Sequence, residues 1–481
     1  MESSHAHVLD PHRWQALAVV CVAFFMTVLD VSIVNVALPS IKTSLHVGES
    51  SLQWVLIAYT ITFGGLLLLG GRAADLLGRR RMFMIGLVLF AAASLACGLA
   101  GSIGVLVAAR AIQGIGAAII SPATLSIITT TFTEGAERNK ALGIWGAMGG
   151  SGAAAGVLFG GILTKYAGWE WVFFVNVPVA VLVLAVTRSV VRESRITGMR
   201  GFDVAGATTI TTSLALLVYA ISKAPDVGWS SGRTIGLLLA AAVLLIAFVV
   251  IETRQSDPMM PFGIFRTTTV TGANVAGFLL GAVVFSNFFL LTLYVQQVLH
   301  YSALKTGLTF LATAGTVIPV AGLSQALVTR FGPRPVMASG LVLITGGMVW
   351  YSQIPVHANF VSDLLPGYLM VGIGMAFAFI PMSIAALAGV EPHEAGLASG
   401  LINTSQQIGG ALGVAIAATV AFTHTTTLLH AGHDLADAQT SGFALGFWVI
   451  AGFGAAAVVA TLALVRSQEV VIEAEAVRAL Q

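Results

Sequence analysis

Long apolar runs follow one another along almost the whole chain, and they limit its possible folds more than any other feature. A bilayer-spanning helix needs about 20 mainly apolar residues. Only 9% of the 481 residues are charged and 57% are apolar, whereas soluble domains carry about 25% charged residues. Lipid offers no hydrogen-bond partners to the backbone, so each run must cross as a helix. We predict an all-α integral membrane protein with fourteen transmembrane helices, at 15–38, 52–71, 82–101, 104–125, 139–163, 170–190, 203–221, 234–252, 270–298, 303–329, 335–352, 364–388, 395–422 and 442–466.

The loop charges predict the orientation of these helices. With the N-terminus in the cytoplasm, 17 of the 23 Lys and Arg residues fall on the cytoplasmic side and five on the outer side. Cytoplasmic loops are enriched in these residues. We expect a multi-pass protein of the cell inner (plasma) membrane with both termini cytoplasmic. The net charge of +2 suggests no nucleic-acid partner, and the His, Cys and acidic residues suggest no metal site.

A weak internal repeat organises the chain. Residues 134–156 resemble residues 391–413 at an offset of 257, which also relates Asp30 to Asn287. Two parallel six-helix repeats around a site at the membrane midplane are typical of transporters. The predicted parts are a cytoplasmic tail (1–14), a six-helix bundle (15–190), a linker (191–202), two inserted helices (203–252), a second linker (253–269), a second six-helix bundle (270–466) and a cytoplasmic tail (467–481).

An acid interrupts the first apolar run. Asp30 at a helix centre costs about 2.5–3.5 kcal/mol on insertion scales, so it must be neutral, paired or hydrated. Counting residues places it about 13 Å below the outer face, and places Arg110 of the fourth run about 9 Å below the same face. The two are therefore candidate partners in proton coupling. The alternatives are a helix–helix hydrogen bond of fixed protonation for Asp30, and an Arg110 that reaches the outer headgroups.

Two further motifs stand out. The hairpin "GGRAADLLGRRRMFMIG" (70–86) groups Gly71, Asp75, Gly78, Arg79 and Arg80; the simplest alternative is that its charges serve only to set topology. The run "GIWGAMGGSGAAAGVLFGG" (143–161) is too apolar, and lacks the preceding strand, for a dinucleotide-binding turn. Its glycines predict a face for close helix contact: Gly143, Gly152, Gly156, Gly160 and Gly161.

These motifs resemble the major facilitator superfamily and, within it, the fourteen-helix drug:proton antiporter-2 (multidrug efflux) family. The resemblance implies that Asp75 and the following arginines latch the two halves at a cytoplasmic gate. It also implies that Arg110, in "RAIQGIG" (110–116), faces inward and takes part in proton coupling. The glycine run resembles the antiporter signature, except that Val157 stands where the family has proline. Similar stretches cover nearly the whole chain, among them "LDVSIVNVALPSI" (29–41) and "WEWVFFVNVPVA" (169–180), where Glu170 replaces the usual arginine.

The expected function is proton-driven export of lipophilic, cationic or neutral drugs or antibiotics by alternating access. The expected partners are a small lipophilic substrate and membrane lipid, the proton is the coupling ion, and we expect no cofactor, no enzymatic activity and a functional monomer. The alternatives are a dedicated exporter of one endogenous metabolite or antibiotic, an uptake permease and, from another class, a non-transporting membrane receptor. Polar and aromatic residues within the spans are weak substrate-binding candidates, with helix packing as their alternative role: Trp54, Tyr59, Trp145, Asn274, Asn287, Tyr294, Gln296, Asn403 and Gln407.

Overall fold

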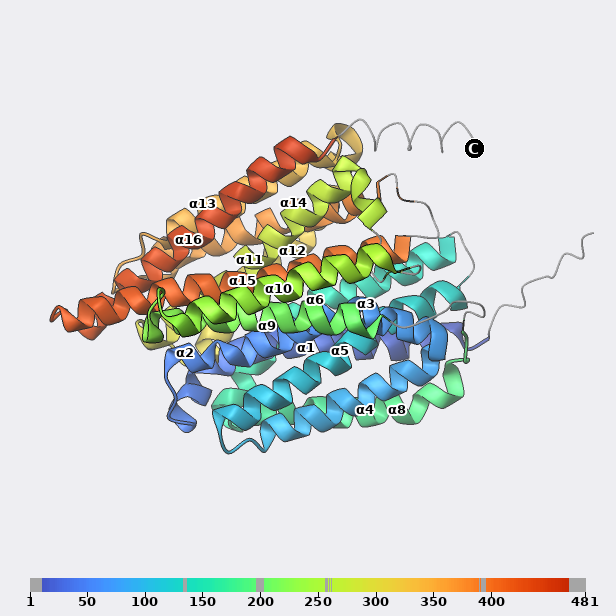
Figure 1. Cartoon of the computed structure of the whole chain (residues 1–481), viewed down its shortest axis with the longest axis horizontal. Helices are drawn as coiled ribbons and strands as arrows, with labels where there is room; N and C mark the ends of the chain where they lie inside the picture. Colours follow the sequence, from blue (N-terminus) through green and yellow to red (C-terminus); the bar gives the residue numbers. More distant parts are fainter. Residues whose placement is uncertain are drawn as a thin grey trace, which may run out of the picture.

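The computed structural model describes residues 11–132, 136–195, 203–255, 258, 260, 262–388, 390 and 395–466. The tail 467–481, and parts of the tail 1–14 and of both linkers, lie outside these residues. The regular structure of the described residues is helical, and the long helices run side by side (Figure 1).

The helices follow the predicted order. The first part contains α1 (Arg13–Ser44), α2 (Glu49–Leu52), α3 (Trp54–Leu77), α4 (Arg79–Gly98), α5 (Ile103–Thr131), α6 (Ala136–Tyr166), α7 (Trp171–Phe174) and α8 (Asn176–Val190). The inserted pair is α9 (Val204–Val227) and α10 (Gly232–Arg254). The last part contains η1 (Phe262–Arg266), α11 (Thr268–Gln297), α12 (Ala303–Phe331), α13 (Pro333–Tyr351), η2 (Phe360–Leu364), α14 (Leu365–Leu387), α15 (Ala395–His430) and α16 (Leu435–Leu464).

Length and composition single out the helices that can cross a membrane. Within the described residues, twelve helices are long and apolar enough. The two other long helices, α6 and α13, have 31 and 19 residues and do not belong to these twelve. The all-α membrane fold is therefore confirmed, while the count of fourteen spans stays a prediction.

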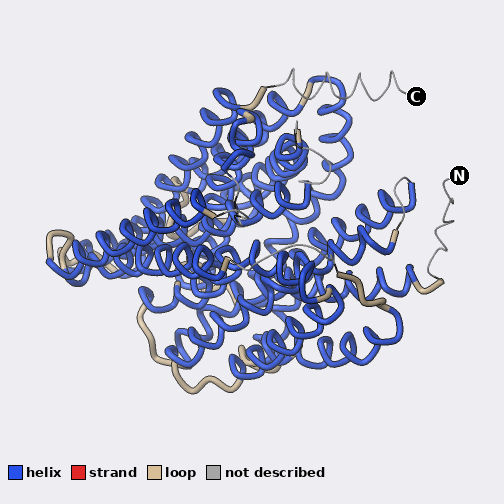
Figure 2. The backbone as a smooth tube through the Cα atoms, turned by 45° about the vertical axis from the view of Figure 1, so that its right-hand side comes forward, coloured by secondary structure: helices blue, strands red, loops and turns tan. Residues whose placement is uncertain are grey.

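The two ends of the helix bundle are defined by the helix ends that lie there. The described chain begins and ends at the same end of the bundle (Figure 2). We call this the terminal end; α1 begins there at Arg13 and α16 finishes there at Leu464. The opposite end, where α1 finishes at Ser44 and α15 finishes at His430, is the distal end.

The two six-helix groups pack in the same pattern. In the first group α1 packs against α6, and α5 against both α3 and α4. In the second group the corresponding helices make the same contacts, since α11 packs against α15, and α14 packs against both α12 and α13. The groups meet mainly along two interfaces, α3 with α15 and α6 with α12, which the repeat relates to each other.

The inserted pair covers one side of this arrangement. Helix α9 packs against α3 and α15, one helix from each group, while α10 packs mainly on α9. Only 17% of an apolar 18-residue stretch of α10 is buried inside the protein, so most of that helix is available to lipid.

Helices α6 and α12 are in close contact at the distal end and less so toward the terminal end. At the distal end a Cβ on Gly161 of α6 would lie 2.7 Å from the carbonyl oxygen of Ala303 on α12. Toward the terminal end, Gly143 of α6 and Gly322 of α12 would each place a Cβ with no described atom within 4 Å. Figure 2 shows the helices spreading apart in that direction. Close contact between α6 and α12 is therefore confined to the distal end, whereas α3 and α15 also meet toward the terminal end, where a Cβ on Gly400 would lie 2.8 Å from Leu68.

Candidate functional site

Close packing between α1 and α6 fixes the position of Asp30. A Cβ on Gly152 would lie 3.1 Å from the Phe25 oxygen, one on Gly156 would lie 2.6 Å from the Leu29 oxygen, and one on Gly160 would lie 2.8 Å from the Ile33 oxygen. Three of the five predicted glycines thus lie against successive turns of α1. The fourth, Gly161, faces α12, and Gly143 faces open space. Only glycine at these positions lets α6 approach α1 on both sides of Asp30.

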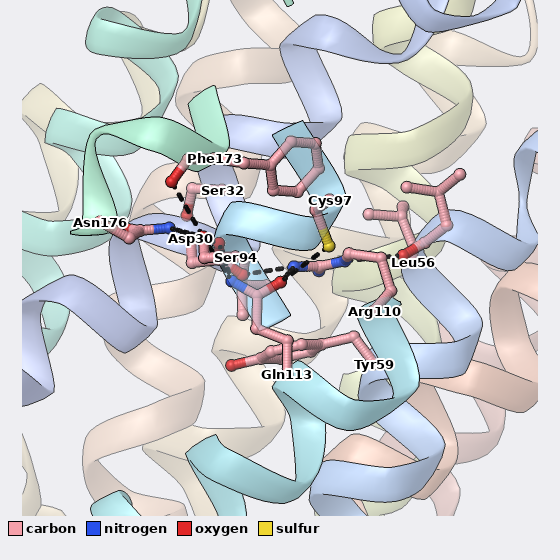
Figure 3. A network of polar contacts seen from close by, with 12 residues as sticks. Asp30, Ser32, Leu56, Tyr59, Ser94, Cys97, Arg110, Gln113, Phe173 and Asn176 are labelled. Atoms are coloured by element: carbon pink, nitrogen blue, oxygen red, sulfur yellow. Dashed lines mark hydrogen bonds and ion pairs between the residues drawn. The ribbon is translucent and has the colours of Figure 1, made fainter. Parts of the chain in front are cut away.

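Asp30 and Arg110 form a buried ion pair. Nη1 of Arg110 on α5 lies 2.5 Å from Oδ2 of Asp30 on α1 (Figure 3). Both residues have 0% of their surface exposed. A buried charge is tolerated only when it is paired and hydrogen-bonded, so each side chain here depends on the other.

Three more polar side chains complete the network around the pair. Gln113 accepts a hydrogen bond from Arg110 Nη1 at 2.6 Å and donates one to Asp30 Oδ1 at 2.8 Å. Asn176, at the start of α8, donates to the same Oδ1 at 2.8 Å. Ser94 of α4 accepts from both amides at 3.1 Å and donates to the Phe173 carbonyl at 2.9 Å. Four helices, α1, α4, α5 and α8, thus hold one carboxylate in place.

The guanidinium of Arg110 has further contacts beyond the carboxylate. Its Nε donates to the Val55 carbonyl at 3.0 Å. Its Cζ lies 4.3 Å from the centre of the Tyr59 ring and 5.7 Å from that of Phe173. Aromatic faces attract cations, more strongly in dry surroundings. Tyr59, expected at the substrate site, therefore belongs to the Asp30–Arg110 network.

Sequence reasoning missed part of this network. Gln113 and Asn176 lie in stretches that carried the family resemblance, but nothing assigned them a role. Ser94 gave no signal, because a serine in an apolar span usually bonds to its own helix. The remaining buried carboxylates of the described residues, Asp203 and Glu252, lie at the terminal ends of α9 and α10.

The predicted gate residues form a second cluster at the terminal end. Arg79 donates through Nε to Asp75 Oδ1 at 2.9 Å, and Ser126 of α5 donates to the same oxygen at 3.0 Å. Gly78 has a φ of +108°, which favours glycine and gives the sharp turn between α3 and α4. Gly71 packs against Pro122.

Glu193, which the sequence did not single out, closes this cluster. Its carboxylate accepts from the backbone N–H groups of Arg80 and Arg81 at 3.1 Å, at the first turn of α4. Arg80 also pairs with it at 3.7 Å. A carboxylate there satisfies free N–H groups and complements the helix dipole. The partners of Asp75, Arg79 and Arg80 among the described residues all lie within 75–194, in the first group of helices.

The aromatic substrate candidates lie in separate places. Trp54 approaches Tyr219 of the inserted α9, with ring centroids 6.0 Å apart. Trp145 of α6 stacks on Phe24 at 4.1 Å. Tyr294 is buried and donates to the Pro355 carbonyl at 2.6 Å. The structure does not bring these three side chains together.

The amide candidates are also dispersed. Gln296 donates to the Val36 carbonyl at 2.9 Å and so ties α11 to α1 at the distal end. Asn274 accepts from Ser405 of α15 at 3.0 Å. Asn403 is exposed and donates to its own helix. The side-chain oxygens of Asn287 and Gln407 are buried and meet no hydrogen-bond donor in the described part of the chain.

Comparison with known proteins agrees with this fold. The chain resembles an inward-facing, unoccupied bacterial homologue of the human lysosomal transporter Spinster, with a TM-score of 0.67, 15% identity and 95% and 98% of the two chains covered. It also resembles the POT family transporter PepTSo, with a TM-score of 0.69, 14% identity and 94% and 98% covered. At these identities the likeness concerns the fold alone.

Several proteins are more similar to this chain in sequence than these solved structures are. A puromycin resistance protein of Streptomyces alboniger is 38% identical over 96% of this chain and 93% of its own length. A cephamycin export protein of Amycolatopsis lactamdurans is 38% identical over 84% of each chain. A lincomycin resistance protein of Streptomyces lincolnensis is 34% identical over 94% and 91%.

A family model settles the relationship that the motifs indicated. The model described as Major Facilitator Superfamily matches residues 20–414. Together with the drug-resistance relatives, this confirms the predicted family resemblance and the prediction of a transporter rather than an enzyme. The chain belongs to the Major Facilitator Superfamily, among membrane transporters related to antibiotic resistance and export proteins.

Proposed function

We propose that the chain is a proton-driven exporter of lipophilic, cationic or neutral antibiotics. It would have fourteen spans and both termini in the cytoplasm, and would use the proton as coupling ion without a cofactor. The terminal end is then the cytoplasmic end. The observation that carries the proposal is the fully buried Asp30–Arg110 pair, held by side chains from four helices.

The pair is suited to bind and release one proton. With Asp30 ionised, its charge and that of Arg110 cancel, and its oxygens accept from Arg110, Gln113 and Asn176. A proton on Asp30 removes the negative charge and leaves the site with one positive charge. Arg110 keeps the Val55 and Gln113 carbonyl oxygens and the Tyr59 ring as neutral partners, so the cation is still supported after Asp30 is neutralised.

Coupling follows from the helices that carry the network. Asp30 lies on α1, which packs against α6, and α6 reaches α12 of the other group. A change in the network on protonation is transmitted to the interface along which the groups diverge. Alternating access in this fold is largely a rocking of one group against the other. We propose that the protonated and ionised states of Asp30 favour opening of the molecule at opposite ends.

The relatives support an antibiotic as the exported compound. Proteins named for resistance to puromycin and lincomycin and for export of cephamycin each match most of this chain. A dedicated exporter of one endogenous antibiotic is the second candidate, because a cephamycin export protein is among these relatives. The family match gives no support to a non-transporting receptor.

Transport by the purified protein in proteoliposomes tests the proposal. An imposed pH gradient should drive ethidium, puromycin or lincomycin against its concentration gradient. Asp30→Asn keeps the shape of the side chain but cannot exchange a proton, so it should bind the compound and lose proton-driven accumulation. The matched control is Asp437→Asn, the same change at an exposed position on α16, which should transport like the wild type.

Each outcome distinguishes between hypotheses about the transport mechanism. Equal accumulation by wild type and Asp30→Asn would show that the buried acid is structural and that the proton path lies elsewhere. Transport of one compound only would favour the dedicated exporter. Accumulation without any dependence on the pH gradient would contradict proton coupling altogether.

A further inference from the structure

The hydrogen bonds around Asp30 form a closed ring through Ser94 (Figure 3). The Ser94 hydroxyl donates its one hydrogen to the Phe173 carbonyl at 2.9 Å, so its oxygen can only accept from other groups. It accepts at 3.1 Å from the side-chain nitrogens of Gln113 and Asn176. Each of these nitrogens also donates to Oδ1 of Asp30 at 2.8 Å. The serine thus makes both amides present N–H groups to the carboxylate.

The two carboxylate oxygens of Asp30 therefore differ. A carboxylate oxygen has two lone pairs, and the two amide hydrogen bonds occupy both of those on Oδ1. Oδ2 accepts one hydrogen bond from the described residues, from Nη1 of Arg110. A proton needs a free lone pair, so Oδ2 is the oxygen that can bind it. This is the same oxygen that Arg110 contacts.

Two other titratable groups lie near Asp30. The Tyr59 ring lies 4.3 Å from Cζ of Arg110, and Cys97 donates to Oε1 of Gln113 at 3.7 Å. Phenols and thiols are neutral near pH 7. The charged side chains of α6 and α8, which pack against α1, lie near the ends of those helices: Glu137, Arg138, Lys140, Lys165 and Arg188. Arg110 is therefore the charge that competes with a proton for Oδ2.

We infer that Asn176 positions the proton at this site: it helps to reserve Oδ1 of Asp30, so that a proton binds at Oδ2 in competition with Arg110. The inference deepens the proposed function and rests on it. Gln113 has the same role at Oδ1 but also accepts from Arg110 at 2.6 Å. Asn176 donates to Asp30 and Ser94 instead, so a change at Asn176 isolates the effect on the carboxylate.

This arrangement ties proton binding to the ion pair. A proton on Oδ2 removes the charge from the oxygen that Arg110 contacts, so the pair is weakened whenever the proton is bound. Loss of the Asn176 amide leaves one lone pair of Oδ1 free. A proton can then bind to Oδ1 while Arg110 stays on Oδ2. It also binds at higher pH, because the ionised carboxylate has lost a hydrogen bond.

Infrared titration of the purified full chain in lipid nanodiscs tests the inference. The carbonyl band of protonated Asp30 is identified by its absence in Asp30→Asn, and its pH midpoint reports proton affinity without any transported compound. Asn176→Leu keeps a similar side-chain shape and removes the donor. We expect its midpoint to lie about one pH unit or more above that of the wild type, a roughly tenfold gain in proton affinity.

The matched control is Asn35→Leu. It is the same change at a buried asparagine of α1, whose amide donates to the Val31 carbonyl of its own helix at 2.9 Å. Its midpoint should equal that of the wild type. Ser94→Ala is a second, milder variant that removes the hydroxyl orienting both amides, so its midpoint should rise by a smaller amount. Circular dichroism and size-exclusion profiles show which variants are folded, and Ser94→Ala carries the test if Asn176→Leu is not.

A midpoint that stays unchanged in folded Asn176→Leu, or in Ser94→Ala where that variant carries the test, would overturn the inference. An equal shift in Asn35→Leu would also overturn it, because the effect would then be a general result of losing a buried amide. A band that titrates in the wild type and does not respond to Asn176 leaves the proposed function intact. The absence of any titrating band that depends on Asp30 would contradict the proposed function and the inference together.

Discussion

Gly156 of α6 lies directly against the backbone of Leu29 on α1, so that a Cβ atom at Gly156 would come within 2.6 Å of the Leu29 carbonyl oxygen. Leu29 precedes Asp30, so this contact sets the depth and direction of the buried carboxylate. The glycine run of α6 therefore acts on Asp30 through helix packing and contributes no polar side chain of its own.

Replacing Gly156 by alanine should push α6 away from α1. We expect a loss of about 1–3 kcal/mol of stability, as for other overpacked positions, together with weaker proton-driven transport. Thermal unfolding in detergent and the proteoliposome assay measure the two effects. The control is Gly143→Ala on the same helix, where a Cβ meets no described atom within 4 Å; it should be neutral or stabilising by up to about 1 kcal/mol. Similar behaviour of both variants would contradict this assignment.

The Asp30–Arg110 pair should show strong coupling in a double-mutant cycle. Arg110→Gln alone leaves a buried carboxylate unpaired, and such losses cost about 3–5 kcal/mol. Asp30→Asn combined with Arg110→Gln leaves no buried charge and should regain most of that stability, while proton-driven transport stays absent. Unfolding midpoints of the four proteins measure the interaction. Additive effects of the two single changes would mean that the pair is not a unit.

Arg110→Lys tests the geometry of the cation at constant charge. Arg110 donates to Asp30, Gln113 and the Val55 carbonyl at once and lies over the Tyr59 ring. A lysine is a compact point charge that cannot reproduce this planar arrangement. We expect at least a tenfold loss of pH-gradient-driven transport with the protein still folded. Near wild-type transport by Arg110→Lys would show that charge alone suffices.

Glu193→Gln should weaken the terminal end of α4. The carboxylate accepts from two backbone N–H groups and pairs with Arg80. A neutral amide keeps one acceptor oxygen but loses the charge, so we expect a loss of about 0.5–1 kcal/mol. Hydrogen exchange of the amides at the start of α4 should rise in this variant. Exchange as slow as in wild type would show that Glu193 is not needed there.

The hydrogen bond from Gln296 to the Val36 carbonyl should help to keep the distal end closed. Removing it with Gln296→Ala costs the closed state about 1 kcal/mol, a shift of roughly fivefold in population. Spin labels on the exposed residues Tyr166 of α6 and Lys305 of α12 should then report a larger share of long distances. An unchanged distance distribution would show that helix packing alone closes this end.

The sequence by itself determined the membrane fold, the order of the helices and the two charges of the buried ion pair. Apolar length specifies a spanning helix, and a charge inside such a run requires a partner at similar depth, which residue counting located as Arg110. The tertiary structure decided which neutral polar residues surround that pair. Asn176 lies 146 positions from Asp30 in the chain and donates to it only because α8 packs beside α1, and Ser94 of α4 joins the network through the amides of Gln113 and Asn176. Glu193 likewise reaches the first turn of α4 only in the folded chain. Apolar runs alike in composition do not encode which helices become neighbours, because that choice depends on the fit of small side chains between helices.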